Sequence, residues 1–246
     1  MFPKIFGFYE ITSKAKMAIA AIVASVLLAS SVVYVQAYHK LKPVYQIETD
    51  EKVIALTFDI SWGNQTPNPV IDILKEHEVK CTFFLSGPWV KQYPEVVQTI
   101  KEDGHEIGSH GYRHVNLSSL GKKDIQEELM KAHNNIKEVS GVEANLIRTP
   151  NGDYNDSVIE AIREKNYEVI QWSVDSLDWM NPGVNTIIER VTKKIHPGAI
   201  ILMHASDTCK QTTDALPAIL KNLKEQGYKF VTVSELLKMD KEKVEE

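Results

Sequence analysis

Short apolar runs rich in β-branched residues alternate with amphipathic stretches along most of this chain, and this alternation constrains the fold more than any other feature. Strands that alternate with helices form a parallel sheet, either open or closed into a barrel. We predict seven strands, at Val53–Phe58, Thr82–Leu85, Glu106–Ser109, Leu146–Arg148, Val169–Val174, Ile200–Met203 and Phe230–Val233.

Helical periodicity fills the intervals between these strands. Pro88 near the start of one helix, and Gly104 and Gly227 just after the ends of two others, fit the usual start and stop signals. Ser234 is expected to cap a last helix. The other predicted helices lie at Pro69–Glu78, Pro88–Asp103, Lys122–Ser140, Asn155–Asn166, Val184–Ile195 and Thr213–Gln226.

The N-terminal region differs from this body. Met17–Val35 is a run of 19 residues without a charge, and as a helix it would span roughly 28 Å, close to the hydrocarbon thickness of a bilayer. We predict a basic cytoplasmic segment at 1–16 and a transmembrane anchor at 17–37, with the body outside the cytoplasm. A cleaved signal peptide, which would release a secreted body, and a buried soluble helix are the alternatives.

The remaining boundaries follow from composition. A linker is predicted at 38–46 and a charged tail at 239–246. Residues 1–46 carry five Lys against one Glu, so the body is more acidic than the net charge of −5 of the whole chain. An acidic body argues against nucleic acid as a partner, since that affinity comes mostly from Lys and Arg. Two cysteines are too few for a disulfide scaffold, although one disulfide between them stays open.

Chemically useful side chains stand where the predicted strands end. In parallel α/β folds the carboxyl ends of the strands share one rim, where chemistry gathers. Any one of these residues alone would more often cap a helix or form a turn, but their joint placement predicts a site. The residues are Asp59, His110, His114, Arg148, Asp175, Asp178, Trp179 and His204.

His110 and His114 are spaced for a metal site. A gap of four residues lets both imidazoles reach one ion from a helix turn or a tight loop, and a carboxylate from elsewhere would complete a set of two His and one carboxylate. Two surface histidines on a polar loop are the alternative.

Five motifs in chain order resemble those of the polysaccharide deacetylase family, the NodB-homology group of carbohydrate esterases, over residues 47–238. The segment Leu56–Gly63 resembles more narrowly the sporulation-associated branch of spore-forming bacilli. The resemblance implies a distorted (β/α)7 barrel. The motifs are Thr57-Phe58-Asp59, His110-x-x-x-His114, Arg148-x-Pro150-x-Gly152, Asp175-x-x-Asp178-Trp179 and Leu202-x-His204.

The resemblance implies a role for each matched residue in hydrolytic N-deacetylation of an amino-sugar polysaccharide, with peptidoglycan as the expected substrate. Asp59 matches the base that deprotonates water, and Arg148 holds it. His204 matches the acid that protonates the amine, and Asp178 tunes it. The matches with the substrate-binding and metal-binding residues are Trp179 and Leu202 as groove walls, Asn151 as the oxyanion-hole position, and His110 and His114 as metal ligands. We add Trp62 as a second aromatic surface for sugar rings.

One position departs from the family pattern. The second aspartate of the first motif, which is the third metal ligand of the family, is Ile60 here. The resemblance implies a divalent metal, with zinc expected first, but the loss of this ligand predicts a weakly bound metal or none. Three functions therefore stay open: a deacetylase, a catalytically impaired member that binds glycan or acts in wall or spore assembly, and a hydrolase of another ester or amide.

Overall fold

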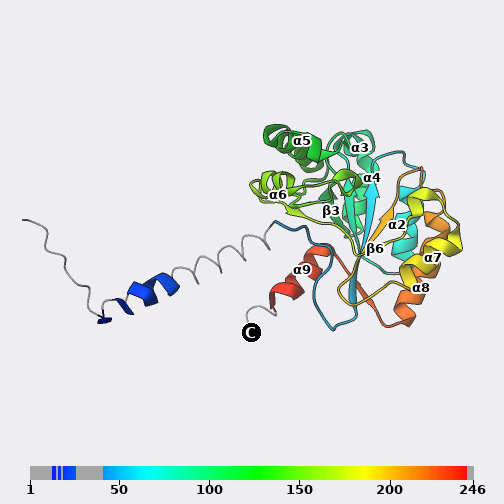
Figure 1. Cartoon of the computed structure of the whole chain (residues 1–246). Helices are drawn as coiled ribbons and strands as arrows, with labels where there is room; N and C mark the ends of the chain where they lie inside the picture. Colours follow the sequence, from blue (N-terminus) through cyan, green and yellow to red (C-terminus); the bar gives the residue numbers. More distant parts are fainter. Residues whose placement is uncertain (1–12, 15, 18, 26–40, 243–246) are drawn as a thin grey trace, which may run out of the picture. The chain divides into compact units, whose positions relative to one another are not determined.

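The computed structural model describes residues 13–14, 16–17, 19–25 and 41–242. The chain divides into two compact units, Met1–Lys42 and Pro43–Glu246, and the second unit contains the parallel sheet (Figure 1). Among the described residues no helix has the length and apolarity needed to cross a bilayer. The predicted anchor at 17–37 lies outside the described residues from position 26 onward.

The sheet is parallel throughout and curls into an incompletely closed barrel, which confirms the predicted fold class. Its strands run in the order β5-β4-β3-β2-β1-β7-β6, and β8 pairs with the start of β1. The strands found in the described residues are β1 (Val53–Ile60), β2 (Thr82–Leu85), β3 (Glu106–Ser109), β4 (Leu146–Ile147), β5 (Glu168–Val169), β6 (Val174–Asp175), β7 (Ile200–His204) and β8 (Lys229–Val231).

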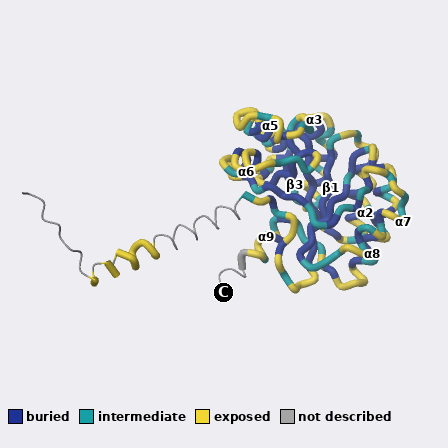
Figure 2. The backbone as a smooth tube through the Cα atoms, in the orientation of Figure 1, coloured by how far each residue is buried: buried dark blue, intermediate teal, exposed yellow. Residues whose placement is uncertain are grey.

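Amphipathic helices surround this sheet, with their buried residues facing it and their polar residues in solvent (Figure 2). Short 3₁₀ turns follow three of the strand ends, at η1 (Leu117–Ser119), η2 (Pro150–Gly152) and η3 (Asp178–Met180). The helices are α2 (Pro67–Glu76), α3 (Gly87–Gln92), α4 (Pro94–Glu102), α5 (Lys122–Ser140), α6 (Asp156–Arg163), α7 (Val184–Thr192), α8 (Thr212–Glu225) and α9 (Val233–Glu242).

The single strand predicted at Val169–Val174 is wrong, because the chain leaves the sheet between β5 and β6. There the Gln171 carbonyl accepts a hydrogen bond from Arg148, and Ile170 bridges to Val44. These groups therefore have partners outside a regular strand ladder. Residues 44–46, inside the predicted linker, bridge Ile170 on one side and Ala199 on the other, and so help to close the barrel.

Two helix predictions also need correction. The helix predicted at Pro88–Asp103 is two helices, because the residue before a proline disfavours helical backbone, and Tyr93, which precedes Pro94, has ψ 57°. The cap of the last helix is Thr232 rather than Ser234. Thr232 Oγ1 accepts from the backbone N–H of Glu235, whose carboxylate accepts from the backbone N–H of Thr232, which is a capping box.

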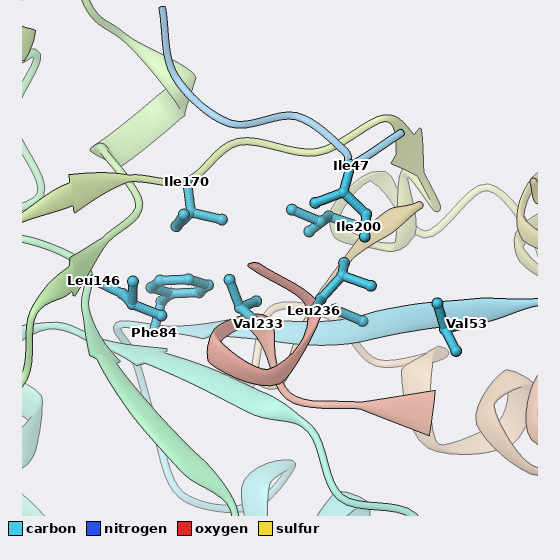
Figure 3. Close-up of a cluster of buried hydrophobic side chains, with 9 residues drawn as sticks. Ile47, Val53, Phe84, Leu146, Ile170, Ile200, Val233 and Leu236 are labelled. Atoms are coloured by element: carbon cyan, nitrogen blue, oxygen red, sulfur yellow. The ribbon is translucent and has the colours of Figure 1, made fainter. Parts of the chain in front are cut away.

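The pleat of β1 sorts its side chains into two faces. Val53 and Ala55 belong to a cluster inside the barrel that also holds Phe84 of β2, while α9 contributes Val233 and Leu236 to the same cluster (Figure 3). Thr57 and Asp59 continue this inner face toward the carboxyl end of the barrel. The alternate residues Ile54, Leu56 and Phe58 face the helix layer and are fully buried, and Ile60 at the end of the strand is fully buried as well.

His105 lies buried at the opposite end of the barrel, between β2 and β3. Its Nδ1 accepts a hydrogen bond from the backbone N–H of Cys81 at 3.3 Å, while its Nε2 is buried without a partner. The edge of its ring meets Phe83. Burial lowers the pKa of His105 to about 4, because an imidazolium would lose its hydration here.

We expect His105 to make the protein acid-sensitive. Its pKa in the fold lies below the ordinary value of 6.5, so its contribution to the free energy of unfolding is complete above pH 6.5. That contribution falls by up to about 3 kcal/mol as the pH drops toward 4. Denaturant unfolding at pH 7 and pH 4.5 measures the loss. His105→Phe should be less stable at pH 7 but lose less stability on acidification. The control His77→Gln should behave like wild type, and an equal acid loss in His105→Phe would contradict the assignment.

Candidate functional site

The carboxyl ends of the strands surround one cavity of about 590 Å³. Eight of the ten residues that the sequence predicts for the site line it, whereas Arg148 and Asp178 lie fully buried behind its wall. The structure therefore brings all the predicted site residues to one place. The eight lining residues are Asp59, Trp62, His110, His114, Asn151, Trp179, Leu202 and His204.

Arg148 holds Asp59 on one side of the cavity. One guanidinium nitrogen donates to Asp59 Oδ1 at 2.9 Å and to Thr57 Oγ1 at 2.7 Å, and the other terminal nitrogen donates to the Gln171 carbonyl. Burial opposes ionisation of Asp59, but the charges of Arg148, His110 and His204 outweigh it and lower the pKa of this carboxyl. Asp59 is therefore an oriented carboxylate at neutral pH.

Asp178 holds His204 on the other side of the cavity. Its Oδ1 pairs with His204 Nδ1 at 2.7 Å, and its Oδ2 accepts from the His204 backbone N–H and from Thr212 Oγ1. Burial disfavours the imidazolium, but the hydrogen bond and charge of Asp178 outweigh this and raise the pKa of His204. The second ring nitrogen of His204 remains for a reacting group in the cavity.

His110 and His114 lie on the loop after β3, as one of the two predicted arrangements requires. Their ring centroids are 5.1 Å apart in an edge-to-face arrangement. His110 Nδ1 lies 2.9 Å from the Arg148 carbonyl, which fixes the proton on Nδ1 and leaves Nε2 unprotonated, 3.7 Å from Asp59 Oδ2. Burial lowers the pKa of His110 to about 4 and also lowers that of His114. Both rings are therefore neutral, as metal ligands must be.

Two half-exposed tryptophans stand at the rim. Trp62 lies with its ring centroid 4.7 Å from that of His114, and Trp179 follows Asp178 directly. Asp207 fixes the loop that carries Trp62 by accepting backbone N–H groups of Gln65 and Thr66. Gly63 has a positive φ of 71°, and a Cβ there would collide with the Asp207 carboxylate, so this close approach requires glycine.

Leu202 and Asn151 complete the predicted wall. Leu202 is almost fully buried in β7, where it pairs with Thr57 of β1. Asn151 lies in η2 with a left-handed φ of 59°, and its amide donates to Asn116 Oδ1 at 2.7 Å. The side chain of Asn151 is thus tied to the neighbouring loop.

The described residues provide only part of a metal site of the expected type. His110 and His114 supply two neutral imidazoles, but Ile60 supplies no ligand, and its side chain is fully buried. Zinc sites of this kind use at least three protein ligands. Asp59, His110 and His114 do not form a trio close enough to share an ion, so the set does not fit a firmly bound metal. In the described part of the chain one other trio is close enough, namely Asp178, His204 and Cys209.

Sequence reasoning missed some of the lining residues. Trp172, Ser206, Thr208 and Cys209 also line the cavity, as does Asp175, which the sequence had already placed at this rim. Cys209 follows His204 by only five positions, so its nearness to His204 could have been noticed. The disulfide left open by the sequence does not form, since Cys81 and Cys209 are both free and buried.

A parallel α/β barrel with a held carboxylate and a carboxylate-paired histidine at its carboxyl end defines a class of acid–base hydrolases, and comparison with known proteins identifies its family. A model of the polysaccharide deacetylase family matches residues 46–170. Peptidoglycan-N-acetylglucosamine deacetylase of Bacillus cereus is 36% identical over 197 residues, covering 79% of this chain and 92% of the relative. The chain belongs to the polysaccharide deacetylase family, a family of carbohydrate esterases.

Two further relatives add detail. The uncharacterized protein YlxY of Bacillus subtilis is 37% identical over 196 residues, which are 80% of this chain but 60% of YlxY. The crystal structure of BA3943 from Bacillus anthracis, described as a CE4 family pseudoenzyme, is 36% identical with a TM-score of 0.75, covering 80% of this chain and 69% of that one. A mutant of BA3943, described as having restored enzymatic activity, matches at 37% identity with the same TM-score.

We expect Ile60→Asp to raise zinc affinity by about tenfold or more, because an added carboxylate would complete a set with His110 and His114. Without zinc the variant should unfold more easily than wild type, since a carboxylate would replace a fully buried apolar side chain. Calorimetric zinc titration and denaturant unfolding measure the two effects.

The matched control is Ile60→Asn, which has the same size as the aspartate and carries no charge. It should be destabilised without gaining zinc affinity. Equal zinc affinity in wild type and Ile60→Asp would mean that the two histidines do not form a metal site.

Proposed function

We propose that this protein hydrolyses N-acetyl groups of an amino-sugar polysaccharide, with peptidoglycan as substrate. The observation that carries the proposal is the presence of two opposed proton-transfer pairs on one cavity, Asp59 with Arg148 and His204 with Asp178. A protein that only bound glycan would need neither pair. The peptidoglycan deacetylases among its relatives support the choice of substrate.

The chemistry assigned to these residues is acid–base hydrolysis of an amide. Asp59, held as a carboxylate by Arg148, accepts a proton from the attacking water. His204 gives a proton to the nitrogen of the sugar as the C–N bond breaks, which releases acetate and a free amine. The backbone N–H of Asn151 is the proposed donor to the carbonyl oxygen during attack. Trp179, Trp62 and Leu202 hold the sugar and its acetyl group.

His204→Ala should lower acetate release from N-acetylglucosamine oligomers by about 10²–10⁴-fold, the usual effect of losing one acid–base group. The fold should survive, since the His204 side chain is part-exposed in the cavity wall. The rate is measured by acetate release and the fold by thermal unfolding. His196→Ala, at the opposite end of the same strand, is the control and should keep the wild-type rate. An unchanged rate in His204→Ala would remove this residue from the mechanism.

A catalytically impaired protein that binds wall glycan is the second candidate. Ile60 favours it, because the third family ligand is missing, and the pseudoenzyme BA3943 at 36% identity supports it. On this alternative the protein would act in wall or spore assembly, in line with the resemblance of Leu56–Gly63 to the sporulation-associated branch. Glycan binding without acetate release by wild type would decide for this candidate.

Both candidates require sugar binding at the rim, and we expect chitin oligomers to shift or quench tryptophan fluorescence. Aromatic rings that are half exposed beside a cavity provide stacking surfaces for the apolar faces of sugars. Trp179→Ala should weaken binding and reduce the signal. Met180→Ala is the control, because Met180 is equally exposed but does not line the cavity. A binding response that Trp179→Ala leaves intact would place the sugar elsewhere.

We propose further that the body works outside the cytoplasm, tethered to a membrane through 17–37. The uncharged run supports this proposal, as do Met17, Ile19, Ile22 and Val23, which are more than half exposed. Apolar side chains of this kind are stabilised by a lipid environment. Protease added to protoplasts tests the location of the body, which should be digested while cytosolic markers are spared.

A further inference from the structure

Cys209 stands beside the proposed acid of the cavity. It lies on the loop after β7, is 1% exposed and contributes to the cavity wall. One ligand atom each from Cys209, His204 and Asp178 lie within 4.8 Å of one another. No step of the proposed hydrolysis uses this thiol.

We propose that Cys209, His204 and Asp178 form a second cation site that takes zinc and other thiophilic divalent ions, and that its occupation blocks catalysis. A thiolate, an imidazole and a carboxylate are three of the ligand types that zinc prefers. The binding part of the proposal stands on geometry alone, whereas the inhibitory part rests on the proposed function of His204.

The three groups need only small movements to enclose an ion. Tetrahedral zinc places its nitrogen, oxygen and sulfur ligands about 3.3–3.6 Å apart. The His204 Nδ1 to Asp178 Oδ1 separation of 2.7 Å must widen to admit an ion in place of the shared proton, and the Cys209 sulfur lies within 4.8 Å of the other two ligand atoms. Asp178 Oδ2 already accepts from Thr212 and the His204 backbone, so these bonds hold the carboxylate while Oδ1 turns to the ion.

Charge balance also favours the loaded site. The thiolate and the carboxylate together neutralise a dication, so a buried net charge does not remain. Burial, followed by the charge of Asp178, raises the pKa of the Cys209 thiol to about 12, so the thiol keeps its proton when no cation is present. As the metal–sulfur and metal–nitrogen bonds form, the thiol proton and the proton that His204 Nδ1 shares with Asp178 both leave to solvent, and a neutral imidazole remains as the ligand.

The effect on catalysis follows from the position of the ion on His204. An ion between His204 and Asp178 replaces the hydrogen bond that keeps His204 protonated, and the imidazole then becomes a metal ligand rather than an acid. Zinc bound at Cys209 is therefore inhibitory, in contrast to the use of a metal that the family pattern implies at His110 and His114.

The test uses the full chain titrated with Co²⁺ after removal of bound metal. A thiolate ligand gives a sulfur-to-cobalt charge-transfer band, which imidazoles and carboxylates do not give. Wild type should show the band. Cys209→Ala should lose it, while Cys81→Ala, which removes the other buried cysteine, should keep it. The double variant His110→Ala, His114→Ala should also keep the band, which separates the two metal positions.

Zinc competition completes the experiment. Zinc should abolish the cobalt band in wild type, and Cys209→Ala should need at least tenfold more zinc for half-inhibition of acetate release, relative to its own untreated rate. Absence of the band in wild type, or its persistence in Cys209→Ala, would overturn the site.

A band that is lost in Cys209→Ala, combined with equal zinc inhibition of wild type and Cys209→Ala, would keep the site and overturn its inhibitory role. A band without any acetate release by untreated wild type would sustain the cation site while refuting the proposed hydrolysis and, with it, the inhibition.

Discussion

The buried guanidinium of Arg148 connects the strands inside the barrel to the cavity at their carboxyl ends. It donates hydrogen bonds to Asp59 and Thr57 on β1 and to the Gln171 carbonyl beyond β5, and its Cζ lies 4.4 Å from the centroid of the Phe84 ring. A charge taken out of water costs several kcal/mol unless it is paired and hydrogen-bonded. These bonds offset much of that cost, although Arg148 Nε has no partner. The backbone carbonyl of Arg148 also orients His110.

The two hydrogen-bonded pairs on the cavity, Asp59 with Arg148 and His204 with Asp178, differ in how the fold sets their charge. Arg148 favours the ionised form of Asp59, whereas Asp178 favours the protonated form of His204. A base and an acid are therefore ready at the same pH on one cavity. The second oxygen of Asp178 accepts hydrogen bonds from Thr212 and from the backbone N–H of His204. These bonds hold the carboxylate in the position from which it favours the protonated imidazole.

Ile60 stands where the family pattern has a metal ligand, and it contributes to packing instead. Ile60 pairs with Leu85 and is fully buried, and an apolar side chain is favourable at a buried position. The strand therefore gains packing where the family pattern places a carboxylate. On the other side of the cavity, Cys209 lies with His204 and Asp178 as a group of potential ligands that differs from the set of the family pattern.

The sequence by itself determined the fold class and the membership of the site. The alternation of strands and helices predicted a parallel sheet, and the family resemblance implied its closure into a barrel. The positions of Asp59, His110, Arg148 and His204 at predicted strand ends placed them on one rim, because parallel strands end on the same side. The tertiary structure decided two features that the local sequence pattern could not predict. It split the predicted strand at Val169–Val174, because Arg148 uses the backbone of Gln171. It also placed Cys209 beside His204, since the distance between two side chains depends on how a loop packs and not on their separation in the chain.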